Sequence, residues 1–382
     1  MLLRKLSLRQ FRAHGSTEMV FAPGINLICG LNGAGKTNIL EAIHYLCIGR
    51  SFIASKDTYA LQFNTQFFDL RGEFEPSRRS AFDIRLVYTP EEGKRAFVNG
   101  APLERLSDLI GRVPVVVFSP GDHVLTEGPP DGRRRFLDNT LSQAKPAYLA
   151  ELLKYRRTMK QRNAVLAMGR FSDAAQLEPW NDEFSKSAAK ITLARAAFVA
   201  EFNRHMEVAC SMMQAISEVP TISYRAFHQL PDDPTEEYIL ELHRDRVKEA
   251  LPREREQRRS LVGPHRDDLM FRLNEMEVRR YASQGQHRTF GMALKLAKFL
   301  YLKAILEDVP LLLLDDVFGD LDRQRARVFL ELLEQSSELG QSLITTADDT
   351  AFHETIDFAK EVHSHQTIVN GAVAKQYAET AK

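Results

Sequence analysis

Cysteine is scarce in this sequence of 382 residues. The three cysteines, Cys29, Cys47 and Cys210, lie far apart, and their spacing matches no metal-binding pattern. An odd number of cysteines without paired spacing also argues against the disulfide framework of a small secreted domain. We therefore expect three reduced, mostly buried thiols.

Long apolar runs are also missing. No stretch approaches the roughly 20 apolar residues that a membrane-spanning helix requires. The first residues, Met1–Lys5, reach charge at once, which is not typical of a secretory signal peptide. These two absences predict a cytoplasmic protein with no membrane partner.

Neither sign of charge is in excess. Lys and Arg together number 51, as do Asp and Glu, so the formal net charge is zero. A zero balance gives no support for a nucleic-acid partner, but it does not exclude one, because a local basic patch is sufficient. With 44% hydrophobic and 27% charged residues, the chain has the composition of an ordinary globular protein with one large domain or two.

One stretch matches the phosphate-binding loop pattern G-x-x-x-x-G-K-[ST] at every fixed position. The apolar run Ile25–Cys29 before it indicates a buried strand, and residues 38–46 after it are apolar at helical spacing. In this context the glycines let successive N–H groups turn toward a phosphate, and the helix N-terminus adds partial positive charge. We predict that the whole stretch binds ATP: Gly30, Leu31, Asn32, Gly33, Ala34, Gly35, Lys36 and Thr37.

Four residues have predicted roles in the chemistry of ATP. Lys36 is expected to reach the β- and γ-phosphates, and Thr37 to hold Mg²⁺. The apolar strand Leu311–Leu314 ends in Asp315 and Asp316, and a parallel sheet would bring these carboxylates to the edge beside the phosphate loop. Asp315 is a predicted Mg²⁺ ligand, and Asp316 the predicted general base or positioner of the attacking water. The alternative, an aspartate pair that caps a helix, is disfavoured by the complete loop upstream.

The segment Ser283–Gln286 is a weak signal by itself, because small polar residues before a helix are usually an N-cap. Its position gives it more weight, since it opens a long predicted helix 32 residues before Asp315. ABC-type ATPases carry their signature motif at this place, where it contacts the γ-phosphate bound by a second copy. By this likeness, Ser283, Gly285 and Gln286 are predicted to bind nucleotide across an ATP-dependent homodimer.

The residues between the phosphate loop and the segment Ser283–Gln286 include a region with helical periodicity. Phe184, Ile191 and Phe198 fall seven apart in a narrow apolar seam. The pattern predicts two long antiparallel helices joined by the polar segment 169–179. A further helix is predicted over Glu236–Ala250, before a densely charged stretch. The predicted domains are a composite head of residues 1–140 and 260–382, and a helical arm of residues 141–259.

Three basic clusters are candidate contacts to a DNA backbone. The first contains Arg133, Arg134 and Arg135, and the second contains Arg156 and Arg157 with Lys160 and Arg162. The third contains Arg253, Arg255, Arg258 and Arg259, and is interrupted by Glu254 and Glu256. The alternative for each is a solvated helix face. No cluster has a base-reading pattern, so binding would be independent of DNA sequence and sensitive to salt.

The sequence resembles the RecF family of bacterial recombination mediators. The resemblance rests on short motifs that follow one another along nearly the whole chain: Leu6–Arg12, Gly30–Ile43, Gly49–Phe52, Phe118–Pro120, Arg133–Asp138, Gly263–Asp268, Ser283–Gln286 and Leu314–Phe318. It implies an α/β fold with an ABC-type P-loop ATPase core and a mixed sheet, like the heads of Rad50 and SMC proteins. An inserted, mostly helical second lobe is implied as well.

The same resemblance implies a function. Members of the family would bind ATP with Mg²⁺, dimerise head to head on DNA, and hydrolyse ATP slowly, as a weak DNA-stimulated ATPase that acts as a switch. The implied role is recombinational repair and replication-fork maintenance. There the protein would act with RecR and RecO to load RecA at gapped DNA and its single-/double-strand junctions, and so support SOS induction.

Some positions depart from the ABC-type pattern. The loop Ser119–Asp122 lacks the usual glutamine, the predicted base is Asp316 rather than a glutamate, and Thr346–Asp348 stands where a switch histidine is common. Each of these changes weakens the orientation of the attacking water, so we expect slow turnover. The motif Gly263–Asp268 has no assignable reaction; a structural or nucleotide-relay role is favoured over a metal site.

Two other functions share part of this pattern. The nucleotide-binding subunit of a membrane transporter has the same loop, signature and aspartates, but its signature follows the loop by roughly a hundred residues. Here Ser283 comes far later, after a charged helical arm. A small-molecule kinase is disfavoured, because it has no use for a signature motif.

Overall fold

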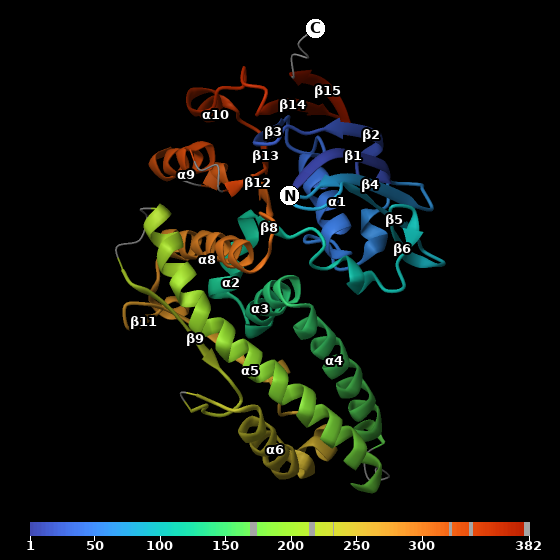
Figure 1. The fold of residues 1–382 in the computed structure, drawn as a ribbon, viewed down its shortest axis with the longest axis vertical. Coiled ribbons are helices and arrows are strands. Elements are labelled where there is room, and N and C mark those ends of the chain that lie inside the picture. Colours follow the sequence, from blue (N-terminus) through green and yellow to red (C-terminus); the bar gives the residue numbers. More distant parts are fainter. Residues whose placement is uncertain (169–173, 214–217, 232, 321–322, 336–338, 378–382) are drawn as a thin grey trace. The chain divides into compact units, whose positions relative to one another are not determined.

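The computed structural model describes residues 1–168, 174–213, 218–231, 233–320, 323–335 and 339–377 (Figure 1). They form two compact units. Unit 1 consists of Met1–Asp122, Ala209–Ile216 and Met292–Lys382, and unit 2 of His123–Val208 and Ser217–Gly291. The domain division inferred from the sequence remains a prediction. The units differ from it by grouping residues 123–140 and 260–291 with the helical arm, and residues 209–216 with the head.

Unit 1 contains a mixed sheet with the strand order β15-β14-β3-β13-β12-β8. The strands are β3 (Ile25–Cys29), β8 (Val115–Phe118), β12 (Leu311–Asp315), β13 (Ser342–Thr346), β14 (Ser364–Val369) and β15 (Ala372–Tyr377). Neighbours run parallel except β14 and β15, which form a predicted Asn-Gly hairpin. Every residue of β3, β12 and β13 is buried. Because both faces are covered, β3 and β12 are mostly apolar along their length. The predicted mixed sheet is confirmed.

An antiparallel sheet lies on the other side of helix α1 (Lys36–Ile48) in unit 1. Its strands are β1 (Leu2–Phe11), β2 (His14–Val20), β4 (Phe68–Glu75), β5 (Phe82–Thr89), β6 (Gly93–Val98) and β7 (Ala101–Pro102). Helix α1 is buried over eleven of its thirteen residues. Its Tyr45 packs edge-on against Phe11 and Phe68 from the sheet, with ring centroids 5.8 and 5.6 Å away. This packing fixes the helix, and with it the loop at its N-terminus.

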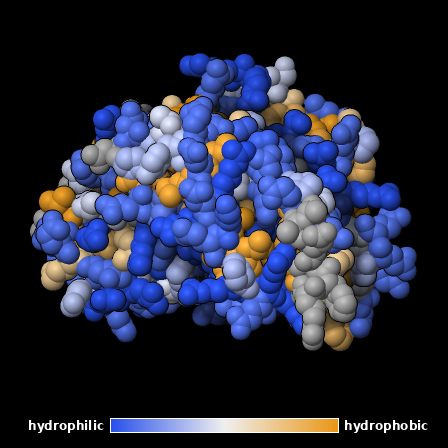
Figure 2. Space-filling view, turned by 90° about the horizontal axis from the view of Figure 1, so that it is seen from below, coloured by the Kyte–Doolittle hydropathy of each residue, from blue (hydrophilic) through white to orange (hydrophobic). Residues whose placement is uncertain are grey.

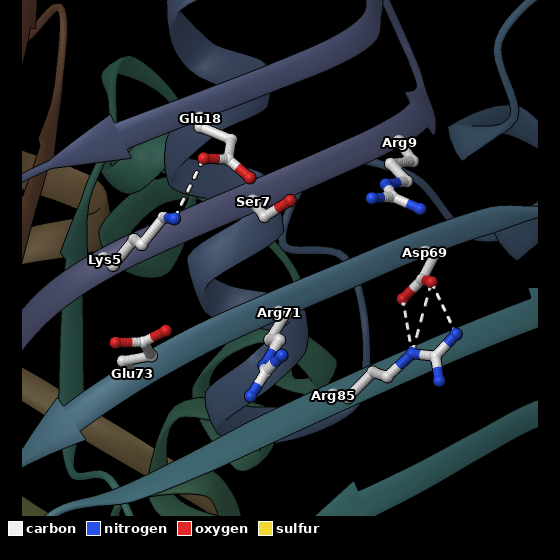
Figure 3. Close-up of a pocket in the computed structure, with 8 residues that line it drawn as sticks. All are labelled: Lys5, Ser7, Arg9, Glu18, Asp69, Arg71, Glu73 and Arg85. Atoms are coloured by element: carbon white, nitrogen blue, oxygen red, sulfur yellow. Dashed lines mark hydrogen bonds and ion pairs between the residues drawn. The ribbon is translucent and has the colours of Figure 1, made fainter.

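The outer face of the antiparallel sheet carries charges of both signs (Figure 3). A hollow of 340 Å³ on this face is lined by Lys5, Ser7, Arg9, Glu18, Asp69, Arg71, Glu73 and Arg85. Lys5 pairs with Glu18 at 2.9 Å, and Arg85 forms a bidentate pair with Asp69. Because cations and anions alternate and pair, this face offers no continuous basic track for a nucleic-acid backbone.

Three more helices contribute to unit 1 or lead into it. They are α8 (Gln284–Ile305), which runs from unit 2 into unit 1, α9 (Arg323–Gln335) and α10 (Thr350–Thr355). Across the residues that the structure describes, no helix combines the length and apolarity needed to cross a membrane.

Unit 2 is mostly helical, with a small antiparallel sheet. Its elements are α2 (Val124–Glu127), α3 (Pro130–Ala144), α4 (Pro146–Ala167), α5 (Ala174–Met213, whose last turns belong to unit 1), β9 (Pro220–Arg225), α6 (Glu236–Gln257), β10 (Asp268–Leu273), β11 (Met276–Glu277) and α7 (Val278–Tyr281). The predicted pair of long helices is present as α4 and α5, and their connection at 169–173 lies outside the described residues. The face shown in Figure 2 is mostly hydrophilic, with its apolar residues scattered in small groups.

Two helix ends in unit 2 differ from the prediction. Helix α5 begins at Ala174 and passes through Pro179, which was predicted to lie in the connection. Helix α6 continues to Gln257 through Pro252, although the prediction ended it at Ala250. A proline removes one backbone hydrogen bond. In α6 the buried Glu254 forms an ion pair with a residue of α4, and this contact stabilises the last turns.

The motif Gly263–Asp268 lies inside unit 2 and has a packing role. The φ of Gly263 is 125°, and a Cβ there would lie 2.6 Å from the hydroxyl oxygen of Tyr155. His265 contacts the same hydroxyl through Nδ1 at 2.6 Å, whereas Asp268 forms a bidentate pair with Arg133. These side chains have separate partners, so their geometry supports the structural role that was favoured over a metal site.

Candidate nucleotide-binding site

The phosphate loop of unit 1 connects β3 to α1, as the motif predicts. Gly35 is the N-cap of α1 with a φ of 103°, and a Cβ there would lie 2.9 Å from Nε2 of His14. Gly30 has a φ of 149°, and a Cβ there would lie 2.4 Å from the carbonyl oxygen of Ile368 in β14. Both positions therefore require glycine, for backbone conformation and for space.

The side chain of Lys36 folds back over the loop. Its ammonium donates hydrogen bonds to the carbonyl oxygens of Gly30 at 2.8 Å and Leu31 at 3.0 Å. These acceptors are neutral, whereas a phosphate oxygen is charged and binds an ammonium more strongly. The lysine is thus positioned at the mouth of the loop, where it could exchange these carbonyls for phosphate oxygens.

The structure brings the two predicted Mg²⁺ ligands together, although they are 278 residues apart. The hydroxyl of Thr37 donates to Oδ1 of Asp315 at 2.7 Å, and the hydroxyl of Thr345 donates to the same oxygen at 2.8 Å. Burial raises the pKa of Asp315, and the two hydroxyls act in the opposite direction. A buried carboxylate beside a threonine hydroxyl is an oxygen-only donor set, which suits Mg²⁺.

Asp316 has a strained backbone at the end of β12. Its φ is 48°, in the left-handed region that few residues other than glycine adopt. Its N–H donates to the carbonyl and hydroxyl oxygens of Thr345, both at 3.1 Å, and its side chain is exposed. Strained residues of this kind cluster at functional sites. The turn directs the second carboxylate away from the core, while Asp315 points into it.

The two loops that depart from the ABC-type pattern are held by contacts of their own. Asp122 accepts a hydrogen bond from the backbone of Ser119 at 2.9 Å, and it pairs with Lys295 at 2.8 Å. Thr346 donates to the carbonyl oxygen of Asp348 at 2.7 Å and closes a tight turn. Neither loop supplies a glutamine or histidine side chain for an attacking water.

Sequence reasoning missed two residues that hold this site in place. Thr345 forms hydrogen bonds with both Asp315 and Asp316. In the sequence, however, a threonine at the end of a buried strand indicates only a residue that favours β-structure. His14 contacts the carbonyl oxygen of Gly35 and the hydroxyl of Thr17, both at 3.0 Å, and burial lowers its pKa. No sequence signal points to His14, because it acts across a distance of 21 residues.

The predicted signature residues lie in unit 2, at the N-terminus of α8. Ser283 and Gln286 form a reciprocal capping box: the serine N–H donates to the glutamine side chain at 2.9 Å, and the glutamine N–H donates to the serine hydroxyl at 3.3 Å. Ser283 and Gly285 are exposed. This turn therefore presents a helix N-terminus and a hydroxyl to the outside of unit 2.

The comparisons with known proteins agree with this geometry. The family model "RecF/RecN/SMC N terminal domain" matches residues 2–370. A protein of Salinibacter ruber described as DNA replication and repair protein RecF is 46% identical over 96% of this chain and 90% of its own length. The chain belongs to the RecF family. A protein of the same description from Chloroherpeton thalassium is 42% identical over 93% of this chain and 97% of its own length.

Solved structures support the fold of this RecF-family chain. A structure described as the recombination mediator protein RecF with ATP in the RecFOR pathway has a TM-score of 0.90 and 29% identity, and covers 98% of this chain and 97% of that one. An SMC head bound to the C-terminal winged-helix domain of ScpA has a TM-score of 0.58, 14% identity, and coverage of 100% and 98%. The predicted ABC-type, SMC-head-like ATPase fold is confirmed.

The predicted DNA contacts of the RecF-family chain divide into buried and exposed arginines. Arg133 is buried, pairs bidentately with Asp268, and donates to the carbonyl oxygen of Gly128 at 2.8 Å. Arg134 is half-buried and donates to the carbonyl oxygen of Asp267 at 2.6 Å. These two side chains are engaged within unit 2.

In the first two clusters, Arg135, Arg156 and Arg157 are exposed. Arg156 pairs with Asp138 at 3.0 Å, whereas Arg162 is buried in an ion pair with Glu254 and is not accessible to DNA. Among the arginines of these two clusters, Arg135 and Arg157 therefore have the most accessible positive charge for a phosphate backbone.

Proposed function

We propose that this chain is a DNA-repair ATPase in which ATP joins two copies head to head on DNA, and slow hydrolysis releases them. In this role it would help RecR and RecO to load RecA at gapped DNA, and so support the SOS response. The observation that carries the proposal is the 2.7 Å contact between Thr37 of the phosphate loop and Asp315 at the end of β12. Nucleotide-dependent retardation of gapped DNA on a gel is the direct test.

The residues of unit 1 can bind and orient the nucleotide. The N–H groups of the loop and the N-terminus of α1 would bind the phosphates, and Lys36 would neutralise charge on the γ-phosphate. Thr37 and Asp315 would hold Mg²⁺, which supplies charge neutralisation at the phosphates when it is bound. Asp316 would orient the attacking water and accept its proton.

The homodimer is proposed because the roles predicted for Lys36, Thr37, Asp315 and Asp316 do not include a contact on the far side of the γ-phosphate. The exposed turn at Ser283 and Gly285 has the hydroxyl and helix N-terminus needed there. A second copy would supply this turn, so binding of ATP and formation of the dimer would be one event. Hydrolysis would remove the γ-phosphate and with it the contact that joins the copies.

Asp316→Asn is expected to bind ATP but to hydrolyse it about 10²–10³-fold more slowly, and to form longer-lived dimers. The amide cannot accept a proton from the water, whereas asparagine tolerates the left-handed backbone found at this position. Single-turnover hydrolysis would measure the effect. As a control, Glu331→Gln changes a carboxylate that pairs with Arg327 on α9, and it should leave the rate unchanged. Native hydrolysis by Asp316→Asn would remove this residue from the mechanism.

Changing both Arg135 and Arg157 to alanine is expected to flatten the dependence of DNA binding on salt. Each lost phosphate contact reduces the slope of log K against log salt by about 0.9, so two contacts reduce it by about 1.8. Fluorescence anisotropy of labelled duplex DNA with ATP, at several salt concentrations, would measure the slope.

The matched control for this DNA-binding variant changes Arg244 and Arg246 to alanine. These arginines are exposed on α6, and each already pairs with a carboxylate, so the native slope is expected. Arg133 should not be included in the test, because Arg133→Ala would leave Asp268 without its partner and disturb packing. A native slope in the Arg135 and Arg157 variant would place the DNA contact elsewhere.

A further inference from the structure

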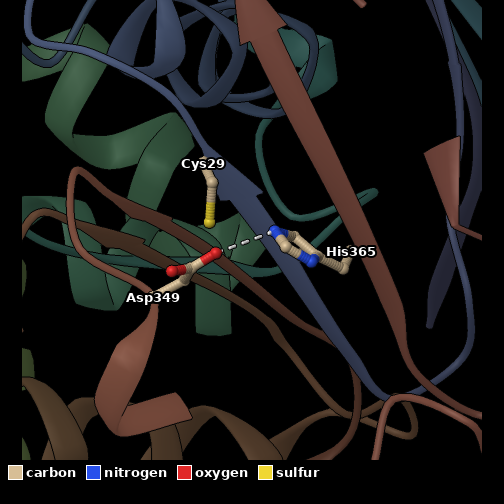
Figure 4. A group of neighbouring side chains, drawn as sticks. All are labelled: Cys29, Asp349 and His365. Atoms are coloured by element: carbon tan, nitrogen blue, oxygen red, sulfur yellow. Dashed lines mark ion pairs between the residues drawn. The ribbon is translucent and has the colours of Figure 1, made fainter. Parts of the chain in front are cut away.

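A second group of reactive side chains lies beside the phosphate loop in unit 1 (Figure 4). Cys29 is the last residue of β3 and directly precedes Gly30. Asp349 stands directly before α10, and His365 lies on β14, which pairs with β3. One ligand atom from each of Cys29, Asp349 and His365 lies within 4.8 Å of the other two.

A second histidine, His353, lies beside this group, although it is not one of the three residues whose ligand atoms all lie within 4.8 Å of one another. Nε2 of His353 lies 3.5 Å from Oδ2 of Asp349, and Nε2 of His365 lies 3.4 Å from the same oxygen. The centroids of the two imidazole rings are 5.1 Å apart. Both histidines thus turn Nε2 toward one carboxylate oxygen of Asp349, and the thiol of Cys29 lies within 4.8 Å of the same carboxylate group.

The donor set is one that zinc prefers. A thiolate, an imidazole nitrogen and a carboxylate oxygen fill three positions of a tetrahedral site, and a water molecule can take the fourth. Bonds of about 2.0–2.1 Å in that geometry place two ligand atoms about 3.4 Å apart. The separation of 3.4 Å between Oδ2 of Asp349 and Nε2 of His365 agrees with this value. Mg²⁺ prefers oxygen ligands, so it would bind at Thr37 and Asp315 instead.

A simple ion-pair network explains less of this arrangement. Asp349 could serve as an acceptor for two histidines without any sulfur atom nearby. The approach of the Cys29 thiol, from a different strand, has no role in such a network. Cys29 and His365 are buried, while the side chains of Asp349 and His353 are 40% and 49% exposed, so an ion could enter from that side. Phe358 packs beside both imidazole rings, with centroids 5.3 and 5.7 Å away.

We propose that Cys29, Asp349 and His365 bind one zinc ion, and that His353 orients the carboxylate of Asp349. The ion would join the strand that leads into the phosphate loop to segment 346–349, which follows β13. Binding would displace the proton of the thiol, so it would release a proton and weaken as pH falls. Segment 346–349 includes the place where ABC-type ATPases commonly have a switch histidine, so zinc could also affect ATP turnover. That effect rests on the proposed function, whereas zinc binding by these residues is independent of it.

Titration of the chelator-treated full chain with Co²⁺ tests the site. We expect one equivalent to produce a sulfur-to-cobalt charge-transfer band, which added Zn²⁺ removes. Cys29→Ser should abolish the band. Cys210→Ser is the matched control, and it should retain the band. Cys210 is also buried, but among the residues that the structure describes it belongs to no cluster of possible metal ligands.

His353→Gln is a second variant that keeps the proposal testable if Cys29→Ser does not fold. His353 is exposed, so its replacement should leave the fold intact while weakening Co²⁺ binding at least about tenfold. Absence of the charge-transfer band in the native chain, or a band that persists in Cys29→Ser, would overturn the proposal. So would unchanged Co²⁺ affinity in His353→Gln. Binding of ATP, measured separately with Mg²⁺, distinguishes loss of the zinc site from failure of the phosphate loop.

Discussion

Arg162→Ala is expected to destabilise unit 2 by about 3–5 kcal/mol, the cost of breaking a buried ion pair. Arg162 donates to Glu254 at 2.5 Å, and both side chains are 0% exposed. The same guanidinium donates to Asn181 and to the hydroxyl of Ser260, each at 2.8 Å. Alanine would leave the buried charge of Glu254 without a cation, with only the N–H of Leu261 still donating to it at 2.7 Å, in addition to two lost hydrogen bonds.

Urea unfolding of the full chain can report on unit 2 alone. Trp180 is the single tryptophan of the sequence. It lies in α5 next to Asn181, which binds Arg162. Its fluorescence therefore follows the part of the structure that the substitution affects. A native unfolding midpoint for Arg162→Ala would contradict the predicted role of this ion pair.

Two controls separate the loss of an ion pair from the burial of a lone charge. Arg246→Ala breaks the pair with Glu249, in which the side chains are 49% and 64% exposed, and it should cost less than about 1 kcal/mol. Replacing both buried partners, with Arg162→Met and Glu254→Leu, should restore stability close to the native value. Apolar groups of similar volume often replace a buried ion pair without loss.

Ser283→Arg is expected to abolish the ATP-induced dimer and, with it, most ATP hydrolysis, while each monomer still binds ATP. The serine is exposed at the N-terminus of α8. A long arginine side chain there would occupy the space that a γ-phosphate of another copy needs. Binding of a fluorescent ATP analogue and steady-state hydrolysis would measure the two properties separately.

This substitution also removes a helix cap, so it needs a control for that loss. Thr235 is the N-cap of α6 and accepts a hydrogen bond from the N–H of Tyr238 at 3.2 Å. Thr235→Arg should lose a similar capping free energy of about 1 kcal/mol but keep the dimer and its hydrolysis. If Ser283→Arg formed dimers as readily as the native chain, the signature would have no role across the interface.

The phosphate-loop half of the site was predictable because its signals are local. A glycine-rich motif between a strand and a helix, and a carboxylate at the end of a parallel strand, meet by the rules of α/β sheets. Thr37 and Asp315 accordingly lie 2.7 Å apart. Thr345 was not predictable, because its role depends on the neighbour that β13 acquires in the sheet.

Arg133, Arg135 and Cys29 show that a sequence pattern does not reveal which residues become neighbours in the folded chain. Arg133 and Arg135 are alike in the sequence, yet one is paired inside unit 2 and the other is exposed. Charge alone does not reveal a partner 135 residues away. The spacing of the cysteines matches no zinc-binding motif, but such motifs identify only ligands that lie close together in the sequence. Cys29 and Asp349 come together through the order of strands in the sheet.

Sedimentation velocity is the most direct test of a dimer closed by ATP. The native chain would be measured with Mg²⁺, first without nucleotide and then with saturating ATP, alongside Ser283→Arg. We predict a monomer without nucleotide, a dimer with ATP, and a monomer in both conditions for Ser283→Arg. A native chain that stays monomeric with saturating ATP, or dimerises equally well without it, would contradict the proposal that ATP completes the interface.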